Sequence, residues 1–118
     1  MKIPPDMWKK TLLCALALVA ANVFAQGRSV VIDVRTPAEF AAGHVPGAIN
    51  IEHTEITRRI DEAKVGKDDQ VIVYCRSGRR SGIAQQALQR LGYTRVENYG
   101  GLDEARARLQ GAPVQAAR

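Results

Sequence analysis

The residues best suited to chemistry form one short segment, the Cys75 loop: Cys75-Arg76-Ser77-Gly78-Arg79-Arg80-Ser81-Gly82. The loop follows an apolar run at residues 71–74, which is typical of a buried strand, and precedes a segment with helical spacing. A helix start offers unpaired backbone N–H groups and the positive end of the helix dipole. These groups and three nearby arginines stabilise a thiolate, so the loop predicts a nucleophilic cysteine that faces an anionic substrate.

A buried structural cysteine is the alternative interpretation of Cys75, because free cysteines often pack in protein interiors. The position between strand and helix, beside arginines, favours a reactive thiol instead. The other cysteine, Cys14, lies in an N-terminal segment that we expect to be removed. Cys75 would then have no partner for an internal disulfide.

Residues 1–25 have the three parts of a secretory signal peptide. Residues 1–10 carry three lysines, residues 11–23 are almost wholly apolar, and Val23 and Ala25 precede a cleavage point before Gln26. We therefore expect a cleaved signal peptide, a periplasmic protein and a single domain over residues 26–118. An uncleaved membrane anchor is the alternative, but a membrane span needs about 20 apolar residues and this segment is shorter.

The charge of the chain argues against a nucleic-acid partner. Three lysines and one aspartate fall within residues 1–25, so the remaining chain carries 14 basic and 11 acidic side chains, a net charge of +3 against +5 for the whole. Apart from Arg58-Arg59 and the Cys75 loop, the basic residues are scattered. A nucleic-acid surface needs a dense basic stripe, which this pattern does not predict.

Apolar runs and helical spacing alternate along the rest of the chain. Strands are expected at residues 30–34, 48–51, 71–74 and 95–99, with helices after Thr36, after Thr54, over 81–91 and over 102–109, and a frayed tail over 111–118. Thr36, Pro37 and Glu39 form a helix start with a capping box. This alternation predicts an α/β fold with a mostly parallel sheet and helices on both faces. Sites in such sheets form at the carboxyl ends of strands, where Cys75 lies.

Three ordered motifs resemble the signature of rhodanese domains: Asp33-Val34-Arg35, Glu39-Phe40 and Gly43-His44-Val45-Pro46-Gly47-Ala48-Ile49-Asn50-Ile51. The Cys75 loop and Gly100-Gly101-Leu102 fall where that family has its active-site loop and its terminal glycine turn. The resemblance extends over about residues 30–109 and is greatest to small exported single-domain rhodaneses of the phage-shock type. It implies a three-layer rhodanese-like fold.

The resemblance also implies a thiosulfate sulfurtransferase in which Cys75 accepts sulfur as a persulfide. In this ping-pong scheme sulfite leaves, and the sulfur then passes to cyanide or to a thiol. Backbone N–H groups of residues 76–81 would hold the persulfide, and loop arginines would hold the sulfonate oxygens of thiosulfate. The expected substrate-binding residues are Arg76, Ser77, Gly78, Arg79, Arg80 and Ser81.

Three residues near the expected site are expected to have structural roles, and for Asp33 and Arg35 this role is implied by the resemblance. We expect Asp33 to bond the backbone near the His44 turn, and Arg35 to pair with a carboxylate such as Glu39. His44 is expected to be a satisfied hydrogen-bonding residue. The two histidines and Cys75 are not spaced as a metal site, and no nucleotide-type glycine loop is present, so we expect neither a metal nor a cofactor.

Two other functions share this loop. A persulfide carrier would receive sulfur from a protein donor, and a cysteine-based phosphatase or arsenate reductase would act on oxyanions. That second class carries an arginine six positions after the cysteine, where this chain has Ser81. Glu52, in place of a frequent proline, and Ala105, in place of an aromatic residue, depart from the family pattern and concern substrate choice. We expect a monomer.

Overall fold

The computed structural model describes residues 28–110, so the expected signal peptide, its cleavage point and the expected C-terminal tail lie outside the described residues. Four strands form one sheet with the order β2-β1-β3-β4, and each neighbouring pair is parallel. The strands are β1 (Ser29–Asp33), β2 (Ile49–Asn50), β3 (Gln70–Cys75) and β4 (Arg95–Gly101). The parallel sheet predicted from the sequence is therefore confirmed.

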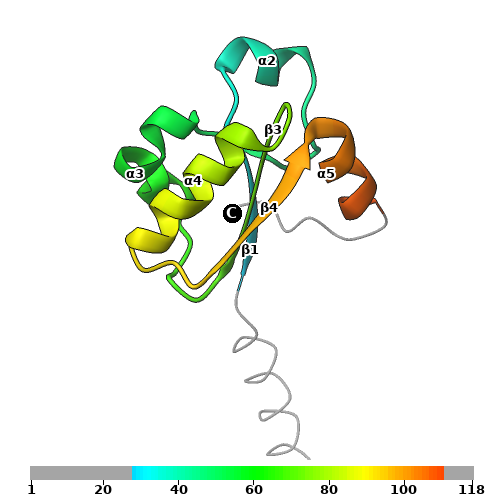
Figure 1. Cartoon of the computed structure of the whole chain (residues 1–118). Coiled ribbons are helices and arrows are strands. Elements are labelled where there is room, and N and C mark those ends of the chain that lie inside the picture. The colour runs from blue at the N-terminus through cyan, green and yellow to red at the C-terminus, as the bar shows by residue number, and fades with distance from the viewer. Residues whose placement is uncertain (1–27, 111–118) are drawn as a thin grey trace, which may run out of the picture.

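Helices cover both faces of this sheet (Figure 1). Helices α3 (Ile56–Arg59) and α4 (Arg79–Arg90) lie on one side, and α5 (Leu102–Leu109) lies on the other. Helix α2 (Pro37–Ala42) lies at the end of the sheet toward which β4 points. The predicted three-layer α/β architecture is confirmed.

The two faces of the sheet bury different sets of side chains, because successive residues of a strand point to opposite sides. On the α3 and α4 side, Val30, Val73 and Cys75 pack with Leu88. On the α5 side, Val31, Ile72 and Tyr74 pack with Ala105, and Phe40 of α2 covers their edge. Both faces of β1 and β3 are buried, which explains why these strands are nearly continuous apolar runs.

Helix α2 begins as its sequence predicts. Thr36 has an extended backbone and its hydroxyl accepts a hydrogen bond from the backbone N–H of Glu39, while the Glu39 carboxylate accepts from the backbone N–H of Thr36. This reciprocal capping box fixes the entry of the helix. Gly43 ends it, and the Glu39 side chain is thereby held near the carboxyl ends of the strands.

The prediction of a helix after Thr54 is wrong in one respect. Thr54 does not cap a single helix; it lies inside a 3₁₀ turn, η1 (His53–Glu55), which is followed by α3 and by a second 3₁₀ turn, η2 (Ile60–Ala63). Ile56, Ile60 and Ala63 are buried as expected. Burial of these side chains, instead of a threonine cap, sets the position of the segment, and it ends at Lys64 with a left-handed φ of 55°.

Helix α4 begins two residues before the predicted start at residue 81. Gly78 precedes it with a φ of 93°, a left-handed conformation that glycine adopts without a steric penalty. This turn brings the chain directly from β3 into the helix, so Cys75 is the last residue of the strand. Within residues 28–110, no helix is long and apolar enough to cross a membrane.

Candidate active site

Cys75 lies at the carboxyl end of β3, under the start of α4. Its neighbour in the sheet register is Gly101 of β4, and the residue is fully buried. Because Gly78 reverses the chain, its backbone N–H points back and donates to Cys75 Sγ at 2.9 Å. Sγ therefore accepts a hydrogen bond from the backbone at the helix start, where N–H groups have no partner within the helix. The sequence predicts this arrangement.

The environment of Cys75 favours the ionised sulfur. Burial raises the pKa of the thiol, but hydrogen bonds from the Ser81 hydroxyl and from the backbone N–H groups of Ser81, Ser77 and Gly78 lower it. In sum the pKa lies below that of an ordinary cysteine. A thiolate is the nucleophilic form of cysteine, so this geometry suits attack on an electrophilic sulfur.

Ser81 connects Cys75 to the last strand. Its hydroxyl lies 3.4 Å from Cys75 Sγ and 2.7 Å from Asn98 Oδ1. Asn98 also donates from Nδ2 to the Gly78 carbonyl at 3.0 Å and accepts from the Gly100 N–H at 2.9 Å. Asn98 was not predicted from the sequence; its one signal was its place as a polar residue near the carboxyl end of the strand beside β3.

The expected terminal glycine turn lies against the Cys75 loop. A Cβ atom added to Gly101 would lie 2.5 Å from the backbone oxygen of Arg76, and one added to Gly78 would lie 3.3 Å from Gly100 Cα. The two backbones approach so closely that a side chain at Gly101 would force them apart. This close approach places Asn98 within reach of the loop.

The three loop arginines differ in their surroundings. Arg80 makes a two-bond ion pair with Glu39 of α2, at 2.8 and 3.0 Å. This pairing, together with the capping bonds from Thr36, lowers the pKa of Glu39 to about 2. Arg76 and Arg79 are exposed, and among residues 28–110 no carboxylate pairs with either. Arg76 and Arg79 are therefore available to bind an anion, whereas the Arg80 guanidinium already binds the Glu39 carboxylate.

Arg35 pairs with a carboxylate, as expected, but the example of Glu39 and the expected backbone partner of Asp33 are wrong. Arg35 pairs with Asp33 and not with Glu39: its guanidinium donates to both Asp33 carboxylate oxygens, with the shortest distance 2.6 Å. Residues two apart at a strand end project to the same side, which brings this pair together. Arg35, and not Asp33, bonds the backbone near His44, through the Gly43 carbonyl at 2.7 Å. Asp33 accepts from the backbone N–H of Arg35.

His44 lies beside α2. Its Nδ1 is 2.8 Å from the Phe40 carbonyl, and its ring stacks on the Phe40 ring with 3.6 Å between centroids. These contacts hold the turn that follows the helix. Across residues 28–110, no group of three or more His, Cys, Asp or Glu side chains could hold a metal ion.

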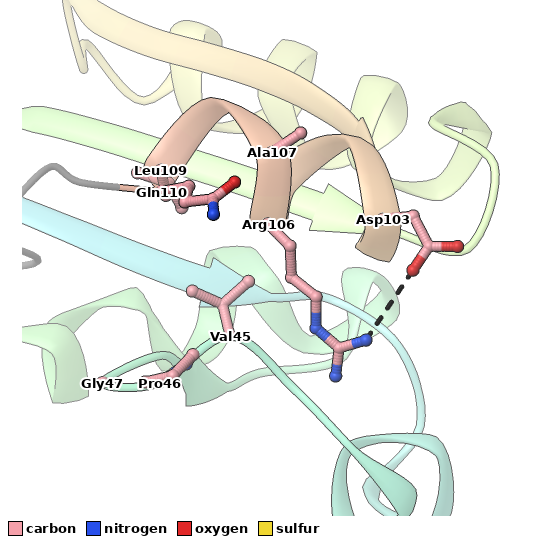
Figure 2. Close-up of a pocket in the computed structure, with 8 residues that line it drawn as sticks. All are labelled: Val45, Pro46, Gly47, Asp103, Arg106, Ala107, Leu109 and Gln110. Atoms are coloured by element: carbon pink, nitrogen blue, oxygen red, sulfur yellow. Dashed lines mark ion pairs between the residues drawn. The ribbon is translucent and has the colours of Figure 1, made fainter.

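Two cavities lie beside α5. One, of about 510 Å³, adjoins the Cys75 loop at Arg76 and is also lined by Glu39, Leu102 and Glu104. The other, of about 790 Å³, lies between the turn at residues 45–47 and the outer side of α5 (Figure 2). No residue of the Cys75 loop lines the larger cavity, so the smaller one is the candidate for small molecules that reach the loop.

Known proteins are similar to this chain in sequence and in fold. The rhodanese-like domain family matches residues 17–107. The thiosulfate sulfurtransferase PspE of Escherichia coli K12 is 46% identical over 98 residues, which cover 83% of this chain and 92% of that protein. The thiosulfate:glutathione sulfurtransferase of Homo sapiens is 33% identical over 92 residues, which cover 68% and 80%. A solved structure described as a rhodanese with anions from E. coli has a TM-score of 0.62 and 49% identity, and covers 64% of this chain and 89% of that chain. The chain therefore belongs to the family of rhodanese-like domains.

Proposed function

We propose that this protein is a thiosulfate sulfurtransferase that carries sulfur as a persulfide on Cys75. Family membership and relatives named as thiosulfate sulfurtransferases support the enzyme class. The observation that carries the proposed chemistry is the contact of Cys75 Sγ with the Gly78 N–H at the start of α4, at 2.9 Å. This contact favours negative charge on sulfur in a position where a nucleophile can act.

The first half-reaction loads the cysteine. The Cys75 thiolate attacks the outer sulfur of thiosulfate, an Sγ–S bond forms, and the bond between the two thiosulfate sulfurs breaks. Sulfite leaves with that electron pair. No general base is required, because the nucleophile is already ionised when it attacks.

The second half-reaction unloads the cysteine. A thiol or cyanide attacks the outer sulfur of the persulfide, and the Cys75 thiolate leaves. The persulfide is an anion, and the backbone N–H groups of residues 76–81 suit its charge, since successive N–H groups at a helix start form an anion-binding concavity. The enzyme thus alternates between two covalent states, which defines a ping-pong mechanism.

Arg76 and Arg79 are the proposed binding groups for the sulfonate end of thiosulfate. Both are exposed residues of the Cys75 loop, and neither is paired with a carboxylate of residues 28–110. Arg80 belongs to the same loop, but its guanidinium is bound by Glu39. We assign to Arg80 the role of holding α2 against the start of α4, so that thiosulfate meets a preformed loop.

Export is part of the proposal. The basic, apolar and small-residue segments of residues 1–25 support a cleaved signal peptide and a periplasmic enzyme formed by residues 26–118. A monomer is the proposed state, because the expected domain over residues 26–118 is small. N-terminal sequencing of the protein from cell fractions tests the export: a periplasmic protein that begins at Gln26 supports it, and a membrane-bound chain that retains residues 1–25 contradicts it.

Steady-state kinetics with thiosulfate and cyanide test the mechanism. A ping-pong enzyme gives parallel double-reciprocal lines when one substrate is varied at several fixed concentrations of the other. Intersecting lines would contradict the persulfide intermediate. Absence of turnover with thiosulfate, together with transfer from a protein persulfide, would favour a carrier; hydrolysis of an aryl phosphate in its place would favour oxyanion chemistry.

A further inference from the structure

The orientation of the Asn98 side chain is fixed by two backbone groups. Nδ2 lies 3.0 Å from the Gly78 carbonyl, which can only accept, so this atom must be the amide nitrogen. Oδ1 lies 2.9 Å from the Gly100 N–H, which can only donate, so this atom must be the oxygen. The two assignments agree and do not depend on any side-chain hydroxyl.

This orientation determines the position of the Ser81 hydroxyl proton. Ser81 Oγ lies 2.7 Å from Asn98 Oδ1, and because Oδ1 has no proton, the hydroxyl must be the donor. A serine hydroxyl has one proton, so Ser81 then presents only a lone pair to Cys75 Sγ, 3.4 Å away. In this arrangement the Cys75 thiol proton is the donor between the two side chains.

Loss of the thiol proton changes what Ser81 must do. A thiolate can only accept, so Cys75 Sγ and Asn98 Oδ1 become two acceptors for one hydroxyl proton. Ser81 and Cys75 are both fully buried, and a buried anion depends on the donors that surround it. Asn98 Oδ1 keeps the Gly100 N–H when the hydroxyl turns away, so rotation toward sulfur leaves no acceptor without a donor.

We propose that Asn98 is a positioning residue that competes with the Cys75 thiolate for the Ser81 hydroxyl proton. The hydroxyl donates to Asn98 in the thiol state and turns to Cys75 Sγ in the thiolate state. No proton is transferred in this rotation; one hydrogen bond breaks and another forms, while the thiol proton leaves to water.

The proposal rests on the proposed sulfurtransferase function and specifies how its loading step is driven. When the Sγ–S bond forms and sulfite leaves with the electron pair, the negative charge moves from Sγ to the outer sulfur. Sγ then no longer requires the hydroxyl, which returns to Asn98. By attracting the hydroxyl away from the thiolate, Asn98 makes the thiolate less stable relative to the persulfide and so favours sulfur loading.

Other charged groups near Cys75 belong to neighbouring elements and stay constant in the test. They are the Asp33–Arg35 pair after β1, Glu39 of α2 with its partner Arg80 of α4, exposed Arg76 and Arg79, and Glu104 of α5 at the adjoining cavity. The neutral substitutions alter none of these charges. A changed ionisation of Cys75 can therefore be assigned to the hydroxyl and the amide.

The experiment is a double-mutant cycle of Asn98→Ala and Ser81→Ala in the whole protein. The pH midpoint of Cys75 alkylation by iodoacetamide reports thiol ionisation and needs no thiosulfate.

We expect Asn98→Ala to move this midpoint down, because the hydroxyl is released to the thiolate. Ser81→Ala should move it up, and Asn98→Ala should then have no further effect. The loading equilibrium, read by mass spectrometry at fixed thiosulfate-to-sulfite ratios, should shift roughly fivefold toward the unloaded enzyme in Asn98→Ala, the factor for one hydrogen bond.

Two results would overturn the proposal. An upward or unchanged midpoint in Asn98→Ala means that the amide only braces the Gly78 turn. An equal Asn98 effect with and without the Ser81 hydroxyl means that there is no competition. If Asn98→Ala does not fold, Asn98→Asp is used, because its carboxylate can still accept from the Ser81 hydroxyl and the Gly100 N–H. The added charge should raise the pH midpoint of Cys75 alkylation, and competition predicts a larger rise with the Ser81 hydroxyl than in Ser81→Ala. Equal rises would refute competition. A wild-type protein that is inert to thiosulfate would refute the proposed function instead, and the alkylation comparison would still stand.

Discussion

The turns that follow β1 and β3 begin side by side, yet they use arginine in opposite ways. The two strands are parallel neighbours, with Asp33 opposite Tyr74 in the register. After β1, Arg35 is buried and neutralised by Asp33 at 2.6 Å. After β3, Arg76 and Arg79 are exposed beside Cys75, and the sulfur is held by backbone N–H groups. The buried Asp33–Arg35 pair has a structural role, and we call it the closed pair. Arg76 and Arg79, which we call the open arginines, are available to bind an anion.

One ion pair joins the two turns. Glu39, on the helix that follows the β1 turn, binds Arg80 on the helix that follows the β3 turn. The β1 turn is also fixed by Asn50, whose Nδ2 donates to the Asp33 and Arg35 carbonyls. The turn after β1 is therefore linked to the turn after β3 through Glu39 of α2. We expect changes in the first turn to affect mainly stability and changes in the second to affect mainly activity.

Replacing the nucleophile gives the largest expected effect on activity. Cys75→Ser should abolish sulfur transfer, because it removes the sulfur that forms the persulfide while changing little volume. The far-ultraviolet circular dichroism and the urea midpoint should stay close to wild type. Sulfite release from thiosulfate measures the activity, and retained turnover in this variant would rule out Cys75 as the carrier.

Breaking the closed pair should affect stability strongly. Asp33→Ala leaves Arg35 buried without a partner, which typically costs about 3–5 kcal/mol in unfolding free energy. Urea denaturation measures this loss. The matched control is Glu62→Ala, which breaks the exposed pair between Arg59 and Glu62 and should lower the unfolding free energy far less, because solvent screens that pair. Equal losses of unfolding free energy in the two variants would show that the buried Asp33–Arg35 pair is no more important for stability than an exposed pair.

The open arginines should affect substrate binding with little change in stability. A hydrogen bond to a charged group is worth about 1.5–3 kcal/mol, so removing the arginine that holds thiosulfate should lower kcat/KM on the order of tenfold. Arg76→Ala and Arg79→Ala are compared in the same assay, and Arg90→Ala at the far end of α4 is the control. If neither loop variant alters thiosulfate kinetics, the open arginines do not bind the donor.

Breaking the Glu39–Arg80 pair, which joins the two turns, should have the smallest effect on stability, and this effect should depend on pH. The pKa of Glu39 is lowered from 4.5 to about 2 by Arg80 and Thr36, so its ionised form stabilises the folded state. This contribution is fully present above about pH 4.5 and is lost as the pH falls toward 2. Because the pair is partly exposed, Glu39→Gln should cost less than about 1 kcal/mol at pH 7. The difference in urea midpoint between wild type and variant should shrink over that interval; a constant difference would contradict the assignment.

The Cys75 loop could be predicted from the sequence because its chemistry is local. The strand, the glycine turn, the helix start and the arginines follow one another within a few residues, so their order alone places backbone N–H groups and positive charge near the sulfur. The capping box of α2 is local for the same reason. The prediction at Thr54 was wrong because buried apolar side chains, which depend on the whole sheet, determine that segment.

The contacts that refine the site could not be predicted, because they join distant parts of the chain. Asn98 reaches Ser81 across 17 positions through the alignment of β4 beside β3, and Glu39 reaches Arg80 across 41 positions through the placement of α2. No periodicity in the sequence specifies such pairs. The choice of partner for Arg35 also depends on placement in space: the end of β1 sets Asp33 beside Arg35, whereas α2 sets Glu39 beside Arg80.

The mass of Cys75 after a single exposure to thiosulfate tests the central claim most directly. The protein is mixed with thiosulfate without an acceptor, sulfite is quantified, and the peptide that contains Cys75 is weighed under non-reducing conditions. We predict one sulfite released per chain and one added sulfur atom on Cys75. Sulfite release without added sulfur, or neither change in a folded protein, would contradict a persulfide held at the start of α4.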